Sequence, residues 1–388
     1  MREDGIVIVS AARTPAGSFQ GELSSLAAPE LGAVAIKAAV ERAGIKPEEV
    51  DEVIMGCVLP AGQGQAPARQ AAIKAGVPLA TGATTINKMC GSGMKAVMLA
   101  HDSIVAGSGN IVVAGGMESM SNAPYLLPRA GGRMGHREMK DHMFLDGLED
   151  AYDKGRLMGT FAEDCAQEYR FSREAQDEFA LRSLQRARRA NEDETFAQEI
   201  VPVVVKATKV AKDEQPFKAN LEKIPLLKAA FKKDGTVTAA NSSSISDGAA
   251  ALVLMRHSQA KRRGLSPLAS IIAHATHSQE PGRFTTAPVG AIRKVLDKAQ
   301  WSASQVDLFE INEAFAVVTM AAMKELSLPS DKVNVHGGAC ALGHPIGASG
   351  ARILVTLIYA LQKYDLKRGV ASLCIGGGEA TAIAVEKV

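Results

Sequence analysis

Three sequence patterns from the first half of the chain return in the second half, in the same order and at a nearly constant offset. The helical pattern 38–44 with its downstream Val-Asp pair returns at 294–300, Ser92-Gly93 before an apolar run returns as Ser349-Gly350, and 113–118 is echoed by 374–379. A repeat of this kind indicates a duplicated structural unit. We therefore predict two similar α/β halves, with the functional site near their contact, where the two glycine-rich turns face each other.

Within each half, strand-like and helix-like patterns alternate. The runs 6–10, 53–55 and 111–114 are typical of buried strands, whereas 31–43 and 67–75 have helical periodicity. Strands that alternate with helices predict a largely parallel sheet with helices on both of its faces.

The segment 119–245 interrupts this alternation. Its first part is rich in Met, Gly, Arg and His without clear periodicity, and a charged amphipathic helix is predicted from Ser172 to Arg189. A long excursion in a compact protein is usually functional, for example as a substrate cover. We predict three parts: an N-terminal half, 1–118, completed by 246–266; a loop domain, 119–245, that covers the substrate; and a C-terminal half, 267–388.

Charge and cysteine content exclude several classes of protein. The formal net charge is +2, and no basic stripe interleaved with aromatic residues is present, so we expect no nucleic-acid partner. No apolar run reaches membrane-spanning length, and the chain passes from Met1 into a strand-like run without the pattern of a secretory signal. Five scattered cysteines without a CxxC pair favour a reducing compartment, so we predict a cytoplasmic protein that is not bound to a membrane.

Cys90 lies between a short strand-like run and an apolar helix. At a helix N-terminus, the partial positive charge favours the thiolate, which is the nucleophilic form of cysteine. Gly91 and Gly93 leave room for a substrate to approach the sulfur. The alternative is an inert core cysteine, because free cysteines are commonly buried.

The C-terminal half offers three candidate partners for this thiol. The glycine-rich loop before the last predicted helix holds two histidines, His336 and His344, and a histidine is able to act as a base for a thiol. Cys374 is a second thiol at the end of a strand-like run and is followed by three glycines. Asn312 lies at a predicted strand-to-helix turn, where an amide is a suitable oxyanion donor.

A metal site is an alternative role for the histidines of this loop. His336, Cys340 and His344 are spaced four apart, which would align three ligands on a helix. The glycines and Pro345 in this segment oppose a helix, so we expect no metal site. The other histidines are predicted to be surface or structural residues: His101, His136, His142, His257, His274 and His277.

Four motifs together resemble the signatures of the thiolase family. They are Asn-Lys-Met-Cys-Gly-Ser-Gly around Cys90, Asn-Glu-Ala-Phe at 312–315, Gly-His-Pro at 343–345 and Cys-Ile-Gly-Gly-Gly at 374–378. They follow the family order, the resemblance covers essentially the whole chain, and it is closest to the biosynthetic branch that forms acetoacetyl-CoA. The resemblance implies duplicated α/β units in α-β-α-β-α layers with an inserted loop domain. It also implies CoA thioesters as substrates, with no tightly bound cofactor.

The resemblance assigns a role to each of the four candidate residues. Cys90 would become acylated after His344 takes its proton, and Cys374 would remove an α-proton from a second acyl-CoA. His344 and Asn312, the latter through a water, would hold the enolate oxygen. The backbone N–H groups of Cys90 and Gly376 would form a second oxyanion hole for the tetrahedral intermediates.

The resemblance further implies how CoA is held and how subunits meet. Leu148, Met158, Phe231 and Ser243 would contact the pantetheine arm, and Phe315 would close the pocket; simple core packing is the alternative for the first three. The segments 87–93 and 134–143 would lie near subunit contacts, because these enzymes are dimers or dimers of dimers. A homotetramer acting in fatty acid metabolism is therefore expected.

Four departures from the family pattern leave the acyl-chain preference open. They are Leu157 in place of a histidine, His336 in place of an asparagine, Cys57 in place of an amide residue, and the loop 282–288. The main rival is a degradative 3-ketoacyl-CoA thiolase that accepts longer chains. A decarboxylating condensing enzyme is disfavoured because Cys374 occupies the position of its second histidine or asparagine, and a non-catalytic acyl-CoA binder because all four residues are present.

Overall fold

The computed structural model describes residues 4–129 and 134–388. Residues 1–3 of the predicted N-terminal half and 130–133 of the predicted loop domain lie outside the described residues. The strands are β1 (Ile6–Arg13), β2 (Gly17–Ser18), β3 (Glu52–Gly56), β4 (Gly82–Ile86), β5 (Ile111–Ser119), β6 (Tyr125–Leu126), β7 (Lys140–Asp141), β8 (Val203–Val205), β9 (Thr208–Val210), β10 (Ser246–Arg256), β11 (Ala269–Ser278), β12 (Leu308–Ile311), β13 (Arg368–Ile375) and β14 (Glu379–Lys387). The helices are α1 (Ala28–Arg42), α2 (Pro67–Lys74), α3 (Ser92–Ala106), α4 (Met158–Tyr169), α5 (Arg173–Glu192), α6 (Gln215–Lys218), α7 (His257–Arg262), α8 (Ala287–Ala299), α9 (Ala316–Leu326), α10 (Ala339–Leu342) and α11 (Ser349–Lys363).

Within the described residues, one mixed ten-stranded sheet runs through the molecule in the order β12-β13-β14-β11-β1-β10-β5-β3-β4, with β2 beside β10. The prediction of a largely parallel sheet is wrong. Pairs joined through crossover helices are parallel, as in β3 with β5 and β12 with β13. β14 follows β13 through a tight turn, and β10 returns from the long excursion, so both strands run antiparallel to their neighbours.

The strand order itself is duplicated. β1-β10-β5-β3 in the first half corresponds to β11-β14-β13-β12 in the second, with the same strand directions. The Asp51 side chain accepts the backbone N–H of Ile111 at the start of β5, and the Asp307 side chain accepts that of Arg368 at the start of β13. This shared contact aligns Ile111 with Arg368, and therefore β5 with β13. By this alignment residues 113–118 correspond to 370–375. The predicted echo of 113–118 at 374–379 is therefore out of register by four residues.

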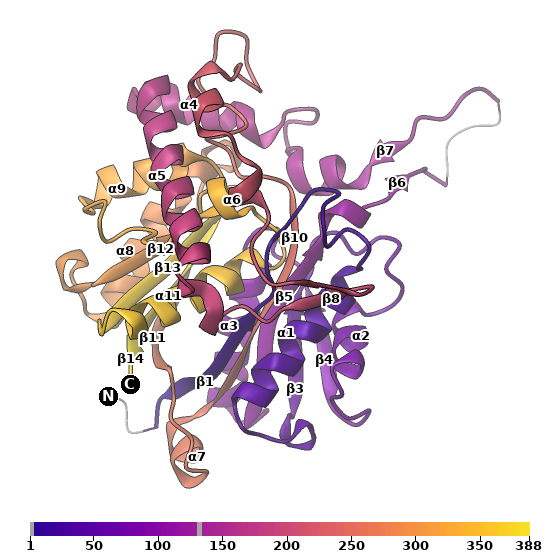
Figure 1. Ribbon diagram of the computed structural model, residues 1–388, viewed down its shortest axis with the longest axis vertical. Coiled ribbons are helices and arrows are strands. Elements are labelled where there is room, and N and C mark those ends of the chain that lie inside the picture. Colours follow the sequence, from indigo (N-terminus) through magenta and orange to yellow (C-terminus); the bar gives the residue numbers. More distant parts are fainter. Residues whose placement is uncertain (1–3, 130–133) are drawn as a thin grey trace.

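Five layers follow from the way the apolar faces are buried. α1 and α2 pack on the outer face of the first half-sheet, and α8 with α9 on the outer face of the second (Figure 1). α3 and α11 lie between the half-sheets in a shared core that takes residues from both. Because these two helices are enclosed, nearly every side chain of α11 up to Leu361 is buried. Their N-termini therefore open at the centre of the molecule.

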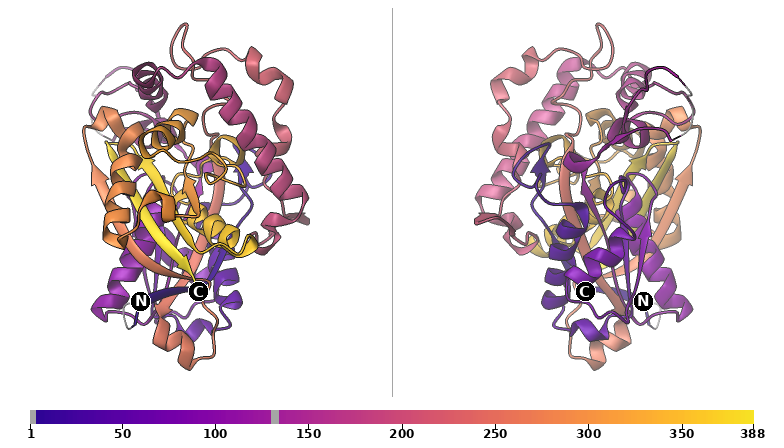
Figure 2. Two further views of the ribbon diagram at one scale, coloured as in Figure 1. Left: turned by 90° about the vertical axis from the view of Figure 1, so that its left-hand side faces the viewer. Right: turned by 90° about the vertical axis from the view of Figure 1, so that its right-hand side faces the viewer.

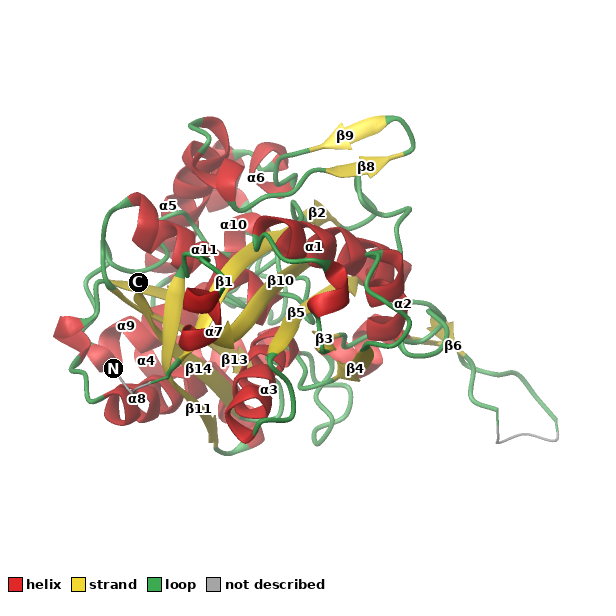
Figure 3. Ribbon diagram, turned by 90° about the horizontal axis from the view of Figure 1, so that it is seen from below, coloured by secondary structure: helices red, strands yellow, loops and turns green. Residues whose placement is uncertain are grey.

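The excursion between β5 and β10 covers one end of this core. It carries α4, α5 and α6 with two short hairpins, and it runs over one end and along one side of the layers (Figures 1 and 2). Ser172 accepts the backbone N–H of Ala175 and so caps α5, close to the predicted helix start. The β6–β7 hairpin projects away from the body, whereas β8–β9 stays near α1 (Figure 3). In the described part of the chain, no helix has the length and apolar character needed to cross a membrane.

Candidate active site

A cavity of about 1050 Å³ lies where the excursion meets the central helices. Cys90, His344 and Cys374 all line it, and they come from both halves of the chain. Cys90 lies two residues before the start of α3, His344 precedes α11, and Cys374 lies near the end of β13. The fold thus brings together three groups that are more than two hundred and fifty residues apart at their extremes.

The turn that holds Cys90 is fixed by hydrogen bonds and by an unusual backbone conformation. Met89 has a φ of 46°, which non-glycine residues rarely adopt. The Ser92 hydroxyl donates to the carbonyl of Met89 (2.6 Å) and accepts the N–H of Lys88 (2.8 Å), which closes the turn. The Cys90 sulfur is consequently held at the N-terminus of α3, facing the cavity.

The Cys90 thiol has a raised pKa. Burial raises its pKa to about 11, although the backbone N–H groups of Gly376 and of Cys90 itself act in the opposite direction. The pKa is thus raised and not lowered, contrary to the predicted preference for the thiolate, because loss of hydration outweighs these backbone hydrogen bonds. A thiol of this kind needs a base to accept its proton before it can act as a nucleophile.

His344 is held in one tautomer. Its Nδ1 lies 2.6 Å from the Ser349 hydroxyl oxygen, and that hydroxyl donates its only proton to the carbonyl of Pro345 at 3.0 Å. Nδ1 must therefore carry a hydrogen, which leaves Nε2 as the unprotonated acceptor. Nε2 is buried and has no hydrogen-bond partner among the described residues. Burial and the charge of Arg352 lower the pKa of His344 to about 3, so the imidazole is neutral at rest.

Cys374 is the second thiol on the cavity wall. It is 1% exposed, and burial together with the charge of Cys90 raises its pKa well above that of a free thiol. Cys90 and Cys374 line the same cavity. Burial thus favours the neutral form of both thiols, and a negative charge on one raises the cost of a charge on the other.

Asn312 follows β12 directly, and its backbone N–H donates to the carbonyl of Ser372. Both polar atoms of its side chain are buried and have no hydrogen-bond partner within the described chain. Asn312 does not itself line the cavity. Because a buried amide normally finds a partner, this side chain is suited to hold a water or a substrate oxygen.

The remaining wall of the cavity is mostly apolar. Five residues predicted to contact CoA line it: Leu148, Met158, Phe231, Ser243 and Phe315. Phe231 and Phe315 meet edge to face, with their ring centroids 5.9 Å apart. Phe231 lies directly against Gly159, where a Cβ would approach its ring to 2.3 Å, so this glycine allows the ring its place. Leu148, Met158 and Phe231 also pack against the protein core, as the alternative interpretation expected.

The positions that depart from the family pattern separate into two groups. Leu157 and Phe284, the latter from the loop 282–288, line the cavity. Cys57 is buried beside Glu118, and His336 packs against Phe196 with its Nε2 3.1 Å from the hydroxyl of Tyr364. Neither Cys57 nor His336 reaches the cavity wall. Only the first group is therefore able to touch an acyl chain.

Two residues that matter for this site were not singled out from the sequence. Ser349 fixes the tautomer of His344, and in the sequence it stands out only as part of a repeat. Glu118 is fully buried and accepts the backbone N–H groups of Val58, Leu59 and Gly347, so it ties together two loops that border the cavity. Burial raises the pKa of Glu118 to about 7. No local motif marks either residue, because each acts through contacts with distant segments.

Both halves of the chain match known families. The family described as thiolase, N-terminal domain, matches residues 6–258, and thiolase, C-terminal domain, matches residues 265–387. The acetyl-CoA acetyltransferase of Cupriavidus necator is 54% identical over 98% of this chain and 99% of its own length. That of Schizosaccharomyces pombe is 51% identical over 99% of both.

Solved structures give the same result in three dimensions. The Acat5 thiolase of Ascaris suum in complex with coenzyme A superposes with a TM-score of 0.95 at 43% identity, covering 99% of this chain and 100% of that one. The acetyl-CoA acetyltransferase of Bacillus anthracis superposes with a TM-score of 0.96, also at 43% identity, covering 99% of both chains.

Proposed function

The chain belongs to the thiolase family, and on that basis we propose that it is an acetyl-CoA acetyltransferase. It catalyses the reversible condensation of two acetyl-CoA molecules to acetoacetyl-CoA and CoA through an acyl-cysteine intermediate. The observation that carries this proposal is one cavity lined by two thiols and by an imidazole whose free nitrogen is a hydrogen-bond acceptor. Coenzyme A thioesters are the substrates, and no tightly bound cofactor takes part in the reaction.

In the first half-reaction, the Cys90 sulfur attacks the thioester carbonyl of acetyl-CoA. Because the thiol and the imidazole are both neutral at rest, the proton passes to Nε2 of His344 as the carbon–sulfur bond forms. The backbone N–H groups of Cys90 and Gly376 stabilise the oxyanion of the tetrahedral intermediate. The departing CoA thiolate takes a proton from Cys374, which leaves a thiolate beside the protonated His344.

In the second half-reaction, the Cys374 thiolate removes an α-proton from the second acetyl-CoA. The enolate oxygen accepts hydrogen bonds from protonated His344 and, through a water, from Asn312, whose amide has no partner within the described protein. The enolate carbon attacks the acetyl group on Cys90, and the Cys90 sulfur leaves and recovers its proton from His344. Two thiols are required because one is acylated while the other handles the α-proton.

The chain-length preference is tested with a series of substrates. Initial rates of thiolysis are measured with 3-ketoacyl-CoA of four, eight and more carbons; the proposal expects the four-carbon substrate to be fastest. Faster turnover of the longer substrates would establish the degradative thiolase instead. Condensation with malonyl- but not acetyl-thioesters would identify a decarboxylating enzyme, and CoA binding without turnover would identify a non-catalytic binder.

We infer further that the subunits assemble as dimers or dimers of dimers. β4 is an edge strand with β3 as its partner in the sheet, and unpaired edges are sites of strand pairing between chains. Near the projecting β6–β7 hairpin, Leu127, Met134 and Met139 are exposed, as suits a segment covered by another subunit. Light scattering on the purified protein tests the assembly, and a monomer would contradict it.

We also propose that the segment 119–245 acts as the cover over CoA, between the halves 1–118 with 246–266 and 267–388. Its residues supply Leu148, Met158, Phe231 and Ser243 to the cavity wall. The five cysteines are all free, which supports a reducing compartment, and we propose the cytoplasm and fatty acid metabolism. Cell fractionation tests the location.

A further inference from the structure

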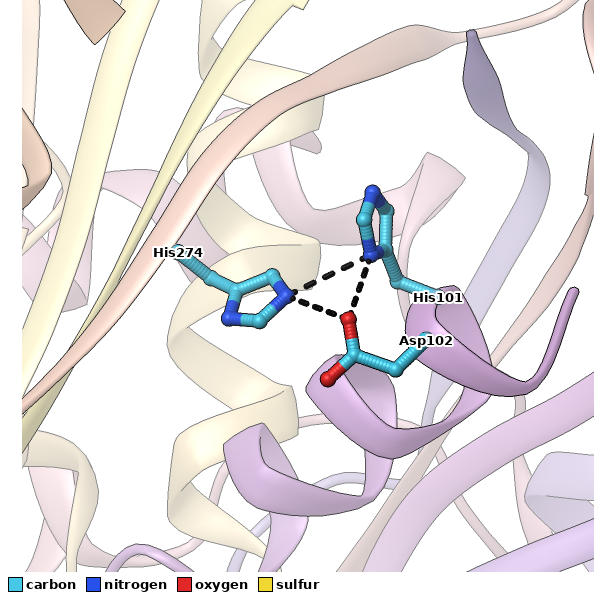
Figure 4. Close-up of side chains that lie close together, drawn as sticks. All are labelled: His101, Asp102 and His274. Atoms are coloured by element: carbon cyan, nitrogen blue, oxygen red, sulfur yellow. Dashed lines mark hydrogen bonds and ion pairs between the residues drawn. The ribbon is translucent and has the colours of Figure 1, made fainter. Parts of the chain in front are cut away.

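Two histidines and an aspartate converge away from the cavity. His101 and Asp102 lie in the second half of α3, and His274 lies on β11. Nδ1 of His101 is 3.0 Å from Oδ1 of Asp102, Nε2 of His274 is 2.9 Å from the same oxygen, and the two nitrogens are 3.3 Å apart (Figure 4). Three potential ligand atoms from two elements thus form a nearly equilateral triangle.

The triangle has the dimensions of one face of a metal coordination shell. A tetrahedral zinc ion with bonds of about 2.0 to 2.1 Å places its ligand atoms about 3.3 Å apart. An octahedral ion with bonds of about 2.1 Å places neighbouring ligands about 3.0 Å apart. The observed edges of 2.9, 3.0 and 3.3 Å lie in this range, so a single ion above the triangle reaches all three atoms at normal bond lengths.

The donor set indicates which ion. Two imidazole nitrogens and one carboxylate oxygen suit zinc and its neighbours among the divalent transition metals better than calcium or magnesium, which prefer oxygen alone. We propose that His101, Asp102 and His274 form a binding site for one divalent transition-metal ion of the zinc class, with its remaining positions filled by water.

A hydrogen-bonded triad without metal is the competing explanation. In that case the single oxygen of Asp102 accepts from both rings, and both rings must carry their hydrogens on nitrogens only 3.3 Å apart. A metal ion replaces both of those hydrogens and uses all three lone pairs. The side chains are also within reach of solvent, since that of Asp102 is 53% exposed, so an ion is able to enter.

The site would join the two halves of the fold. α3 belongs to the first half and carries Cys90 before its first residue, whereas β11 opens the second half. His101 is nine residues beyond that first residue, about 14 Å along the helix axis. None of the three ligands lines the substrate cavity. A bound ion therefore acts on the stability of the contact between halves and not on the reaction, and the inference does not depend on the proposed function.

Zinc titration of the metal-stripped, full-length protein tests the site. Isothermal titration calorimetry with zinc chloride is performed on the wild-type protein, Asp102→Asn, His274→Gln and the control His136→Ala, which removes an exposed histidine outside the cluster. All four proteins keep the five free cysteines, so any zinc bound by cysteine is the same in each of them. A difference in the number of bound zinc ions therefore reports on His101, Asp102 and His274 alone. Circular dichroism checks that each variant is folded. If one of the two cluster variants does not fold, the other still tests the site.

We expect the wild-type protein and His136→Ala to bind one more zinc ion than the two cluster variants, or to bind it about tenfold or more tightly. Zinc should raise the melting temperature of the first pair by more than that of the second. Equal stoichiometry and affinity in all four proteins, or no zinc bound by any of them, would overturn the proposal.

Discussion

The two halves of the fold contact each other crosswise at the active site, and the two contacts differ in chemistry. Glu118, near the end of β5, accepts the backbone N–H of Gly347 in the turn before α11. On the opposite side, Gly376, just after β13, directs its backbone N–H to the sulfur of Cys90 in the turn before α3. By the alignment of the repeats, Cys90 and Gly347 occupy equivalent positions.

The difference shows how a duplicated architecture divides its work. On one side a side chain satisfies backbone groups, so the contact fixes the turn that carries His344. On the other side backbone N–H groups point at the Cys90 sulfur, so the contact stabilises negative charge on that side chain. In the proposed reaction, one helix-start turn therefore supplies the nucleophile and the other supplies the base, although their surroundings are built alike.

The largest effect is expected at the two thiols. Cys90→Ala should abolish formation of the acyl-enzyme and lower turnover by about 10⁴-fold or more, because the nucleophile is lost. Cys374→Ala should still become acylated but should fail in condensation. Mass spectrometry after incubation with acetyl-CoA measures the first step, and the rate of acetoacetyl-CoA formation measures the second. Equally poor acylation of both variants would show that the thiols do not divide the reaction as proposed.

The next effect is on stability and concerns Glu118. Its pKa rises from 4.5 to about 7 on folding, so its contribution to stability is present below pH 4.5 and is lost as the pH rises through 7. Gln resembles the protonated carboxyl. Relative to Glu118→Gln, the wild-type protein should lose about 3 kcal/mol of unfolding free energy between about pH 4.5 and pH 8. Urea unfolding across this range measures the difference in unfolding free energy between the two proteins. A difference that stays constant with pH would mean that the pKa of Glu118 does not change on folding.

Much of this arrangement was predictable from local patterns. Cys90, His344 and Cys374 each stand in a short motif beside glycines, and the repeat predicted that the site lies between the halves. The strand directions were not predictable from alternation alone, because the path by which β10 returns depends on the whole excursion. The protonation state of Cys90 was also missed, since the depth of burial that sets it depends on segments far away in the sequence. The partners of Ser349 and Glu118 were missed for the same reason.

A graded effect is expected where α3 and α11 touch. A Cβ on Gly350 would lie 2.4 Å from the backbone nitrogen of Met94, and one on Gly93 would lie 2.9 Å from that of Ala351. Overpacking of this kind costs about 1 to 3 kcal/mol. Gly350→Ala should therefore lower the melting temperature more than Gly93→Ala, while the control Gly82→Ala, with open space around it, should change little. The reverse order for the first two variants would contradict this packing of α3 against α11.

The smallest effect should separate two equivalent serines, Ser92 and Ser349, which are the first residues of α3 and α11. Ser92 bonds only to the backbone of its own turn, whereas Ser349 also accepts the Nδ1 hydrogen of His344. Ser349→Ala should lower kcat about tenfold, the value of roughly one hydrogen bond, with KM unchanged because Ser349 does not line the cavity.

Ser92→Ala should instead appear mainly as a loss of stability of about 1 kcal/mol, because the N–H of Lys88 loses its acceptor. Steady-state kinetics and thermal unfolding of both variants separate the two roles. If Ser349→Ala kept full turnover and only lowered the melting temperature, the Ser349 hydroxyl would, like that of Ser92, contribute only to the stability of its turn. The imidazole would then have to be oriented by its packing alone, and the chemical difference between the two helix starts would rest on Cys90.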